Sequence, residues 1–139
     1  MNREEFLTKY SETVTRALKF SEKDRREGLL ALEDHLDGEI VNSRDILEYG
    51  LRFVVDGTDA EVIKCILQNI IDQENDKYTK TLMNIQAKAV LCIQAGDNPR
   101  NIFYMMNSYT DLSLTKDPGA KVLDEVISNL NQQNQRPIN

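Results

Sequence analysis

Apolar residues recur at helical spacing along nearly the whole chain, and the longest such stretch begins just after Gly57. From residue 59 to residue 95 neither proline nor glycine interrupts the pattern. The apolar positions of this stretch are Val62, Ile63, Ile66, Leu67, Ile70, Ile71, Tyr78, Leu82, Ile85 and Ala89. We therefore expect one continuous helix over about residues 59–95, capped by Thr58 or Asp59 and on the order of 50 Å long. Shorter helices would pack against it.

Shorter helical patterns precede this stretch. Asn2 is a suitable N-cap for a first helix, because its side-chain oxygen can accept a backbone N–H. The polar residues 21–24 would either start a second helix or lie inside one longer helix, and the sequence leaves both arrangements open. Leucines on one face of residues 25–36 predict further helix, which Gly38 would end.

Cap residues mark the remaining helix ends. Asn42 or Ser43 would start a helix that ends at Gly57. After the long helix, Gly96 is a stop signal, Asn98 an N-cap and Pro99 a residue suited to the first helical position. Asp117 and Pro118 repeat this cap-then-proline signal after a loop over residues 111–115.

These patterns predict an all-α fold: a compact bundle of five or six helices around the long one. No segment shows a convincing strand pattern, and no internal repeat is visible. A chain of 139 residues is expected to form one domain, here over residues 1–130. The Gln- and Asn-rich residues 131–139 are expected to be disordered.

Charge and hydropathy narrow the function classes. The net charge of −6 and the pI of about 4.8 argue against binding to nucleic acid or to anionic membrane surfaces, which both require excess Lys and Arg. No apolar run approaches the roughly 20 residues that span a bilayer, and residues 1–10 do not resemble a signal peptide. We therefore expect a cytoplasmic protein without direct membrane insertion.

Candidate chemistry is sparse. His35 is the single histidine, and Cys65 and Cys92 lack the spacing of a zinc site and are expected to be buried free thiols. The acidic group that includes Asp56 and Asp59 lacks calcium-loop spacing. We expect no catalytic residues, no metal and no cofactor, and hence a protein that is not an enzyme.

The charged residues Arg25, Arg26 and Glu33 are the more informative group. At 100° per residue, Arg26 and Glu33 would share one side of a helix, while Arg25 would lie near the leucine face and extend outward or find a partner. They form either a solvated flank, with an ion pair worth well under about 1 kcal/mol, or a docking surface that selects a partner by charge.

Two segments resemble the cytoplasmic parts of MotA-type flagellar stator subunits, in the MotA/TolQ/ExbB proton-channel family. The first comprises residues 25–33 (RREGLLALE) together with residues 50–59 (GLRFVVDGTD), and the second is residues 89–100 (AVLCIQAGDNPR). The resemblance covers roughly residues 10–110. Its structural motif residues are Gly28, Gly57, Asp59, Gly96, Asn98 and Pro99.

In that family, two transmembrane helices separate the two segments. Here the polar residues 71–80 stand in their place, so the resemblance implies a cytoplasmic region without ion conduction, its two halves fused into the long helix. The family's cytoplasmic region contacts the rotor switch protein FliG through an arginine and a glutamate, which match Arg25 and Glu33. Arg26 stays a candidate, because the helical wheel pairs it with Glu33. The missing spans further imply a monomer or weak dimer.

The resemblance predicts a soluble MotA-like interaction module for motility or chemotaxis, which docks on a rotor protein or stator components, or tunes their engagement. The alternative is a repurposed helical scaffold or adaptor with an unrelated partner, in which Gly28, Gly57 and Pro99 only fix helix ends. Artificial removal of membrane spans from a longer protein is a third alternative, although the Met1 start and the lack of a Gly/Ser linker are not typical of it.

Overall fold

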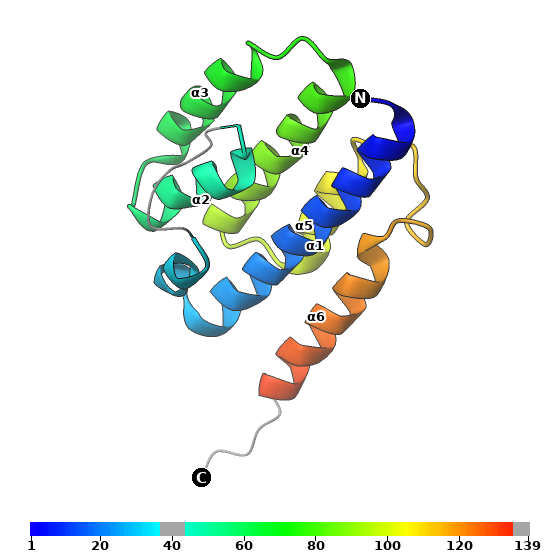
Figure 1. Ribbon diagram of the computed structural model, residues 1–139. Helices are drawn as coiled ribbons and strands as arrows, with labels where there is room; N and C mark the ends of the chain where they lie inside the picture. The colour runs from blue at the N-terminus through cyan, green and yellow to red at the C-terminus, as the bar shows by residue number, and fades with distance from the viewer. Residues whose placement is uncertain (37–43, 135–139) are drawn as a thin grey trace.

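The structure is a computed structural model that describes residues 1–36 and 44–134 (Figure 1). These residues form six α-helices and one 3-10 helix and contain no strand, which confirms the all-α class. The elements are α1 (Arg3–Glu27), η1 (Leu29–His35), α2 (Ile46–Val55), α3 (Ala60–Ile71), α4 (Lys77–Gln94), α5 (Pro99–Asn107) and α6 (Gly119–Asn134).

The central element is α1, the longest helix at 25 residues. It packs against α4 on one side and α6 on the other, with α5 behind it in the view of Figure 1. Asn2 caps α1 as predicted, since its Oδ1 accepts a hydrogen bond from the Glu5 backbone N–H at 2.8 Å. Residues 21–24 lie inside this helix, so the longer of the two open arrangements is the one observed.

The predicted continuous helix over residues 59–95 is wrong, and so is the fusion of two halves into one rod. The α3 helix ends at Ile71, the chain reverses, and α4 begins at Lys77 and packs against α3 (Figure 1). Asp76 causes the new start, because its carboxylate accepts hydrogen bonds from both the backbone N–H and the hydroxyl of Thr79 at 2.9 and 2.7 Å. Reversal also lets Ile71 and the apolar stripe of α4 enter one core, which a straight rod could not achieve.

The other predicted helix ends are mostly confirmed. Gly57 and Gly96 follow α2 and α4 with φ angles of 79° and 75°, and Asn98 caps α5 with Pro99 at its start. Asp59 occupies the N-cap position of α3, although its side chain makes no capping hydrogen bond.

Three local expectations need correction or fall outside the described residues. The N-cap of α2 is Asp45, whose Oδ1 accepts from the Glu48 N–H at 3.3 Å, because α2 starts later than predicted. The expected caps Asn42 and Ser43 and the expected stop Gly38 lie outside the described residues. Residues 131–134 continue α6 instead of forming a disordered tail, and residues 135–139 are also outside the described part.

The core is a continuous apolar cluster to which every helix contributes. Its fully buried large side chains are Tyr10, Leu18, Leu32, Ile46, Leu47, Leu51, Ile63, Leu67, Ile71, Ile85, Ile93 and Ile102. Close packing of α2 on α4 depends on Gly50, since a Cβ there would come within 2.7 Å of a Val90 methyl group. Of the two cysteines, Cys92 is buried as expected, but Cys65 is exposed because it faces outward on α3.

A buried polar network fixes α5 and α6 to α1. The carboxylate of Asp117, which is 3% exposed, accepts hydrogen bonds from the Tyr10 hydroxyl, the Asn107 amide and the Gly119 backbone N–H at 2.5, 2.9 and 2.7 Å. Burial and the neighbouring carboxylate raise the pKa of Tyr10, so its phenol stays protonated and donates. The network thereby sets the position of α6 beside α1.

Candidate protein-binding surface

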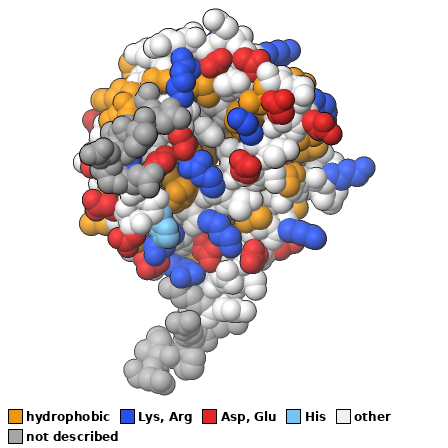
Figure 2. Space-filling model, viewed as in Figure 1, with side chains coloured by type: hydrophobic (Ala, Val, Ile, Leu, Met, Phe, Trp, Pro, Cys, Tyr) orange, Lys and Arg blue, Asp and Glu red, His pale blue; other side chains and the backbone are white. Residues whose placement is uncertain are grey.

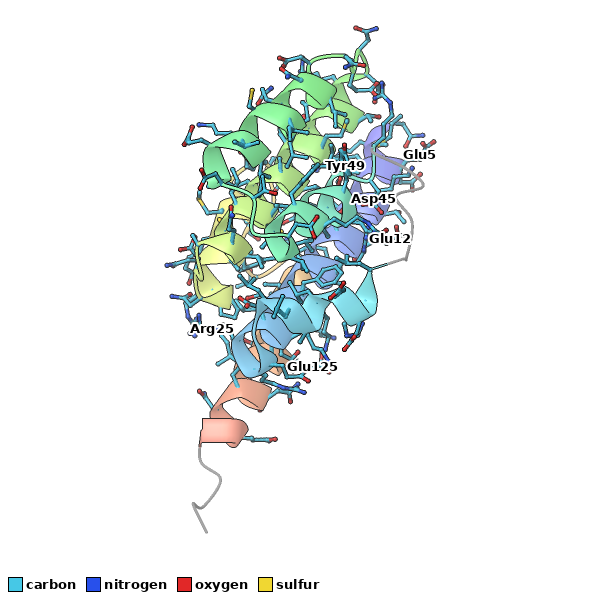
Figure 3. All side chains as sticks on the ribbon, turned by 90° about the vertical axis from the view of Figure 1, so that its left-hand side faces the viewer. Glu5, Glu12, Arg25, Asp45, Tyr49 and Glu125 are labelled. Carbon is cyan, nitrogen blue, oxygen red and sulfur yellow. The ribbon has the colours of Figure 1, made fainter. Side chains whose placement is uncertain are left out.

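Arg25 lies in the last turn of α1 and is exposed. Its guanidinium donates a hydrogen bond to the carbonyl oxygen of Gly96 at 3.1 Å, across the turn between α4 and α5 (Figure 3). A cation is favourable there, because the carbonyl groups at the end of α4 carry the negative end of the helix dipole. Arg25 therefore joins the first family-like segment to the second while its charge stays accessible to solvent.

Arg26 points to a different neighbour. Its guanidinium donates to Glu22 Oε1 at 3.1 Å, and the same oxygen accepts from Asn129 of α6 at 3.0 Å. Glu22 is 6% exposed, so these hydrogen bonds satisfy a carboxylate that has been removed from water. Arg26 thus has a structural role that the sequence pattern did not indicate.

Glu33 lies exposed on η1, and its carboxylate has no hydrogen-bond or ion-pair partner among the residues that the structure describes. The helix expected over residues 25–36 is wrong, and so is the pairing of Arg26 with Glu33 drawn from it. Gly28 ends α1 at a φ angle of 90°, and a 3-10 helix follows, so a single helical wheel does not apply across residue 28.

The two family-like segments meet at one end of the bundle. The Gln94 amide donates to the Thr58 carbonyl at 2.8 Å, which ties the turn after α2 to the last turn of α4. Both turns have the same backbone hydrogen-bond pattern. The Thr58 N–H donates to the Phe53 carbonyl oxygen and the Asp97 N–H to the Cys92 carbonyl oxygen, each at 3.0 Å. Together with the Arg25 contact, these bonds bring residues that are far apart in the sequence into one surface.

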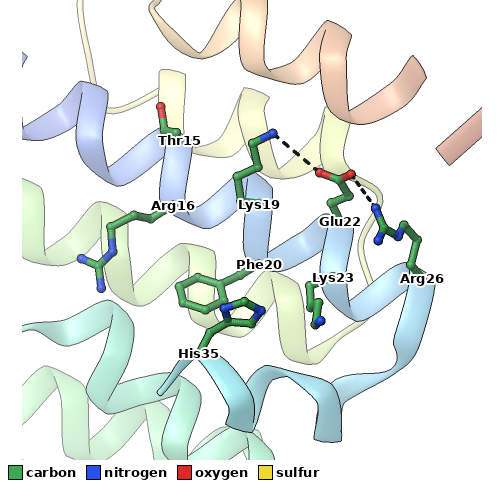
Figure 4. Close-up of a pocket in the computed structure, with 8 residues that line it drawn as sticks. All are labelled: Thr15, Arg16, Lys19, Phe20, Glu22, Lys23, Arg26 and His35. Atoms are coloured by element: carbon green, nitrogen blue, oxygen red, sulfur yellow. Dashed lines mark hydrogen bonds and ion pairs between the residues drawn. The ribbon is translucent and has the colours of Figure 1, made fainter. Parts of the chain in front are cut away.

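A pocket of about 550 Å³ lies along α1 on a neighbouring face, and the sequence analysis missed it (Figure 4). It is lined by Thr15, Arg16, Lys19, Phe20, Glu22, Lys23, Arg26 and His35. His35, expected beside the leucine face, instead lies edge-on to Phe20 with ring centroids 6.4 Å apart. The spacing of residues 16, 19, 20, 23 and 26 on one helix face was a usable signal. The pocket itself also needs η1, which places His35 beside that face.

Two further features are absent from residues 1–36 and 44–134. These residues contain no group of three or more potential metal ligands. Within the same ranges, no helix is both long and apolar enough to cross a membrane.

Three curated relatives match the chain, and each is named Motility protein A. Motility protein A of Treponema phagedenis is 35% identical over 80 residues, and that of Treponema pallidum (strain Nichols) is 34% identical over 80 residues. Both matches cover 58% of this chain and 30% of the relative. Motility protein A of Borreliella burgdorferi is 43% identical over 61 residues, which is 44% of this chain and 22% of that protein.

No protein-family model matches the chain, and no solved structure does. The three curated relatives nevertheless show that this helical protein is related to bacterial motility proteins over part of its length. All three relatives are Motility protein A, or MotA, which confirms the resemblance seen in the sequence. This chain spans less than a third of the length of those curated relatives.

Proposed function

We propose that the chain is a MotA-like interaction module that associates with the flagellar motor in the cytoplasm. It would dock on a rotor protein such as FliG, or on stator components, without conducting ions or catalysing a reaction. The relationship to MotA carries the proposal. The exposed positions of Arg25 and Glu33 support it, because both charges remain available to a partner.

The two charges have different local settings, and this suggests different roles in docking. Arg25 is already oriented by the Gly96 carbonyl, so little conformational freedom would be lost when a partner carboxylate binds it. Glu33 lies on the short η1 element, without a partner in the described residues, and would accept a basic group. Opposite charges of this kind favour one orientation of the partner and speed its association more than they add affinity.

A titration with the C-terminal domain of FliG from the same organism tests the proposal. We expect binding that weakens with added salt and weakens about tenfold in the double variant Arg25→Ala/Glu33→Ala. The matched control is Lys64→Ala/Glu61→Ala, which removes one exposed charge of each sign from α3. Absence of binding at about 100 µM, or equal affinity in both double variants, would refute docking through this surface.

The alternative, a scaffold with an unrelated partner, is favoured by one observation: Arg26 is engaged inside the protein by Glu22. In that case the family-like residues would serve stability alone. Arg25→Ala would then lower the free energy of unfolding as Arg26→Ala does, by about 1 kcal/mol, and leave FliG binding undetected in every variant. Chemical denaturation beside the titration separates the two readings.

A further inference from the structure

The pocket along α1 concentrates basic side chains on a protein that is acidic as a whole. Four of the 17 lysine and arginine residues line it, against one acidic residue, Glu22. Glu22 is buried and engaged by Arg26 and Asn129, so it cannot attract a cation from outside. Toward a ligand, the lining therefore offers cationic groups. Figure 2 shows the surrounding surface, where basic and acidic side chains are interspersed around the single histidine.

The floor of the pocket is partly apolar. Phe20 lies half-buried between α1 and η1, with the His35 ring against its edge, and the hydrocarbon stems of Lys19 and Lys23 flank it (Figure 4). A volume of about 550 Å³ suits one or two side chains of a peptide. The lining thus combines a place for an apolar side chain with cations at its rim.

The cations at the rim have carboxylate partners that a ligand would have to replace. Lys19 lies 3.9 Å from Glu22 and 3.5 Å from Glu125 of α6, while Lys23 lies 2.8 Å from Glu27. Lys19, Glu27 and Glu125 are at least two-fifths exposed and Lys23 is a quarter exposed, so water screens both ion pairs and keeps them weak. A ligand carboxylate can therefore share or displace these partners at little cost, especially when an apolar contact adds to its affinity.

Arg16 and Arg26, the other two cations of the lining, are paired as well, Arg26 with Glu22. Arg16 faces the Asp45 carboxylate with its two terminal nitrogens, at 3.4 and 3.2 Å. Because Asp45 also caps α2, this arginine is tied to the start of that helix. The two lysines stand beside Phe20, so a ligand whose apolar side chain lies on Phe20 would engage them first.

We propose that the Lys19–Phe20–Lys23 pocket binds an acidic segment of a partner protein, with an apolar side chain on Phe20 and carboxylates on the two lysines. The inference goes beyond the Arg25/Glu33 surface and holds whether or not the partner is a rotor protein. The occupant is acidic because the accessible lining is basic, and it is a peptide because a bare anion would leave the Phe20 floor uncovered.

The test uses the full chain and a fluorescently labelled eight-residue peptide of alternating glutamate and leucine. We expect saturable binding that weakens with salt, and amide shifts in two-dimensional NMR centred on residues 16–26 and His35. Lys19→Glu/Lys23→Glu should weaken binding at least about tenfold. The matched control Lys9→Glu/Lys121→Glu makes the same charge change at exposed positions outside the pocket lining and should leave binding unchanged.

A second variant isolates the apolar floor. Phe20→Ala should weaken the glutamate–leucine peptide but not a glutamate–serine peptide of the same charge, which binds through the lysines alone. Circular dichroism of each variant shows whether it is folded. Equal binding in the pocket and control variants, equal binding of a lysine–leucine peptide, or full displacement by inorganic phosphate at matched ionic strength would each overturn the proposal.

Discussion

At the scale of single residues, the buried carboxylate of Asp117 has the strongest structural role. It accepts three hydrogen bonds from residues of α1, α5 and the start of α6. Removing the carboxylate would leave the buried Tyr10 hydroxyl and Gly119 N–H unpaired, whereas the Asn107 amide would keep its bond to the Leu112 carbonyl. Unpaired buried groups cost more than a hydrogen bond gains. Its neighbour in sequence, Pro118, is exposed and contributes no such contact.

Asp117→Ala should therefore lower the free energy of unfolding by about 3 kcal/mol. Tyr10→Phe removes one donor and keeps the other two, so its effect should be only about 1 kcal/mol. Urea denaturation followed by circular dichroism measures both. If the two variants lost similar stability, the network would contribute no more than the single tyrosine hydrogen bond.

At the scale of elements, the turn between α3 and α4 depends on Asp76. Hydrogen bonds from Thr79, first its hydroxyl and then its backbone N–H, together with the N-terminal ammonium of Met1, lower the pKa of Asp76 from 3.8 to about 2. A carboxyl whose pKa is lower in the folded state adds stability at pH values above its unfolded pKa. That contribution is lost as the pH falls from about 4 to about 2.

Asp76→Asn should flatten the loss of stability between pH 4 and pH 2, because the variant has no carboxyl to protonate there. Asp72→Asn is the matched control, because Asp72 is an exposed residue in the same turn. Its carboxylate accepts one hydrogen bond, from the side-chain amide of Gln68. Thermal unfolding across this pH range provides the readout. An unchanged pH profile in Asp76→Asn would mean that the cap does not contribute as the geometry indicates.

The contact between α2 and α4 depends on the absence of a side chain at Gly50. Alanine there would favour an isolated helix, but its Cβ would meet the Val90 methyl groups at 2.7 and 2.9 Å, and valine cannot move them far. Gly50→Ala should lower the free energy of unfolding by about 1–3 kcal/mol. In the double variant Gly50→Ala/Val90→Ala, the smaller residue at 90 makes room, so part of the lost free energy of unfolding should be recovered. If the losses of the two single variants simply add in the double variant, steric overlap is not the cause.

At the scale of the whole molecule, the sequence predicted several helix ends from local cap residues, but it did not predict the contacts that depend on tertiary packing. Asn2, Gly57 and Asn98 determine helix ends through their own hydrogen bonds or φ angles, so the sequence alone predicted them. Residues 72–76 are all polar but include neither proline nor glycine, and Ile71 and Tyr78 on either side keep helical spacing. The pattern therefore concealed the turn that Asp76 creates. The charged surface shows the same division: Arg25 was found by motif, whereas its Gly96 contact and the Arg26–Glu22 pair depend on tertiary packing.

Since α1 contacts α4, α5, α6 and η1, loss of any one neighbour exposes apolar surface on the central helix. The structure therefore predicts a single cooperative unfolding transition, with far-ultraviolet circular dichroism and tyrosine fluorescence changing together in urea. Val126→Ala in α6, where the side chain is fully buried, should shift the whole transition to lower urea by about 2 kcal/mol in stability without splitting it. A separate early transition in that variant would show that α6 is attached to the bundle only loosely. The Asp117 network would then not couple α6 to α1, and the Lys19–Glu125 edge of the pocket would open independently of the rest of the bundle.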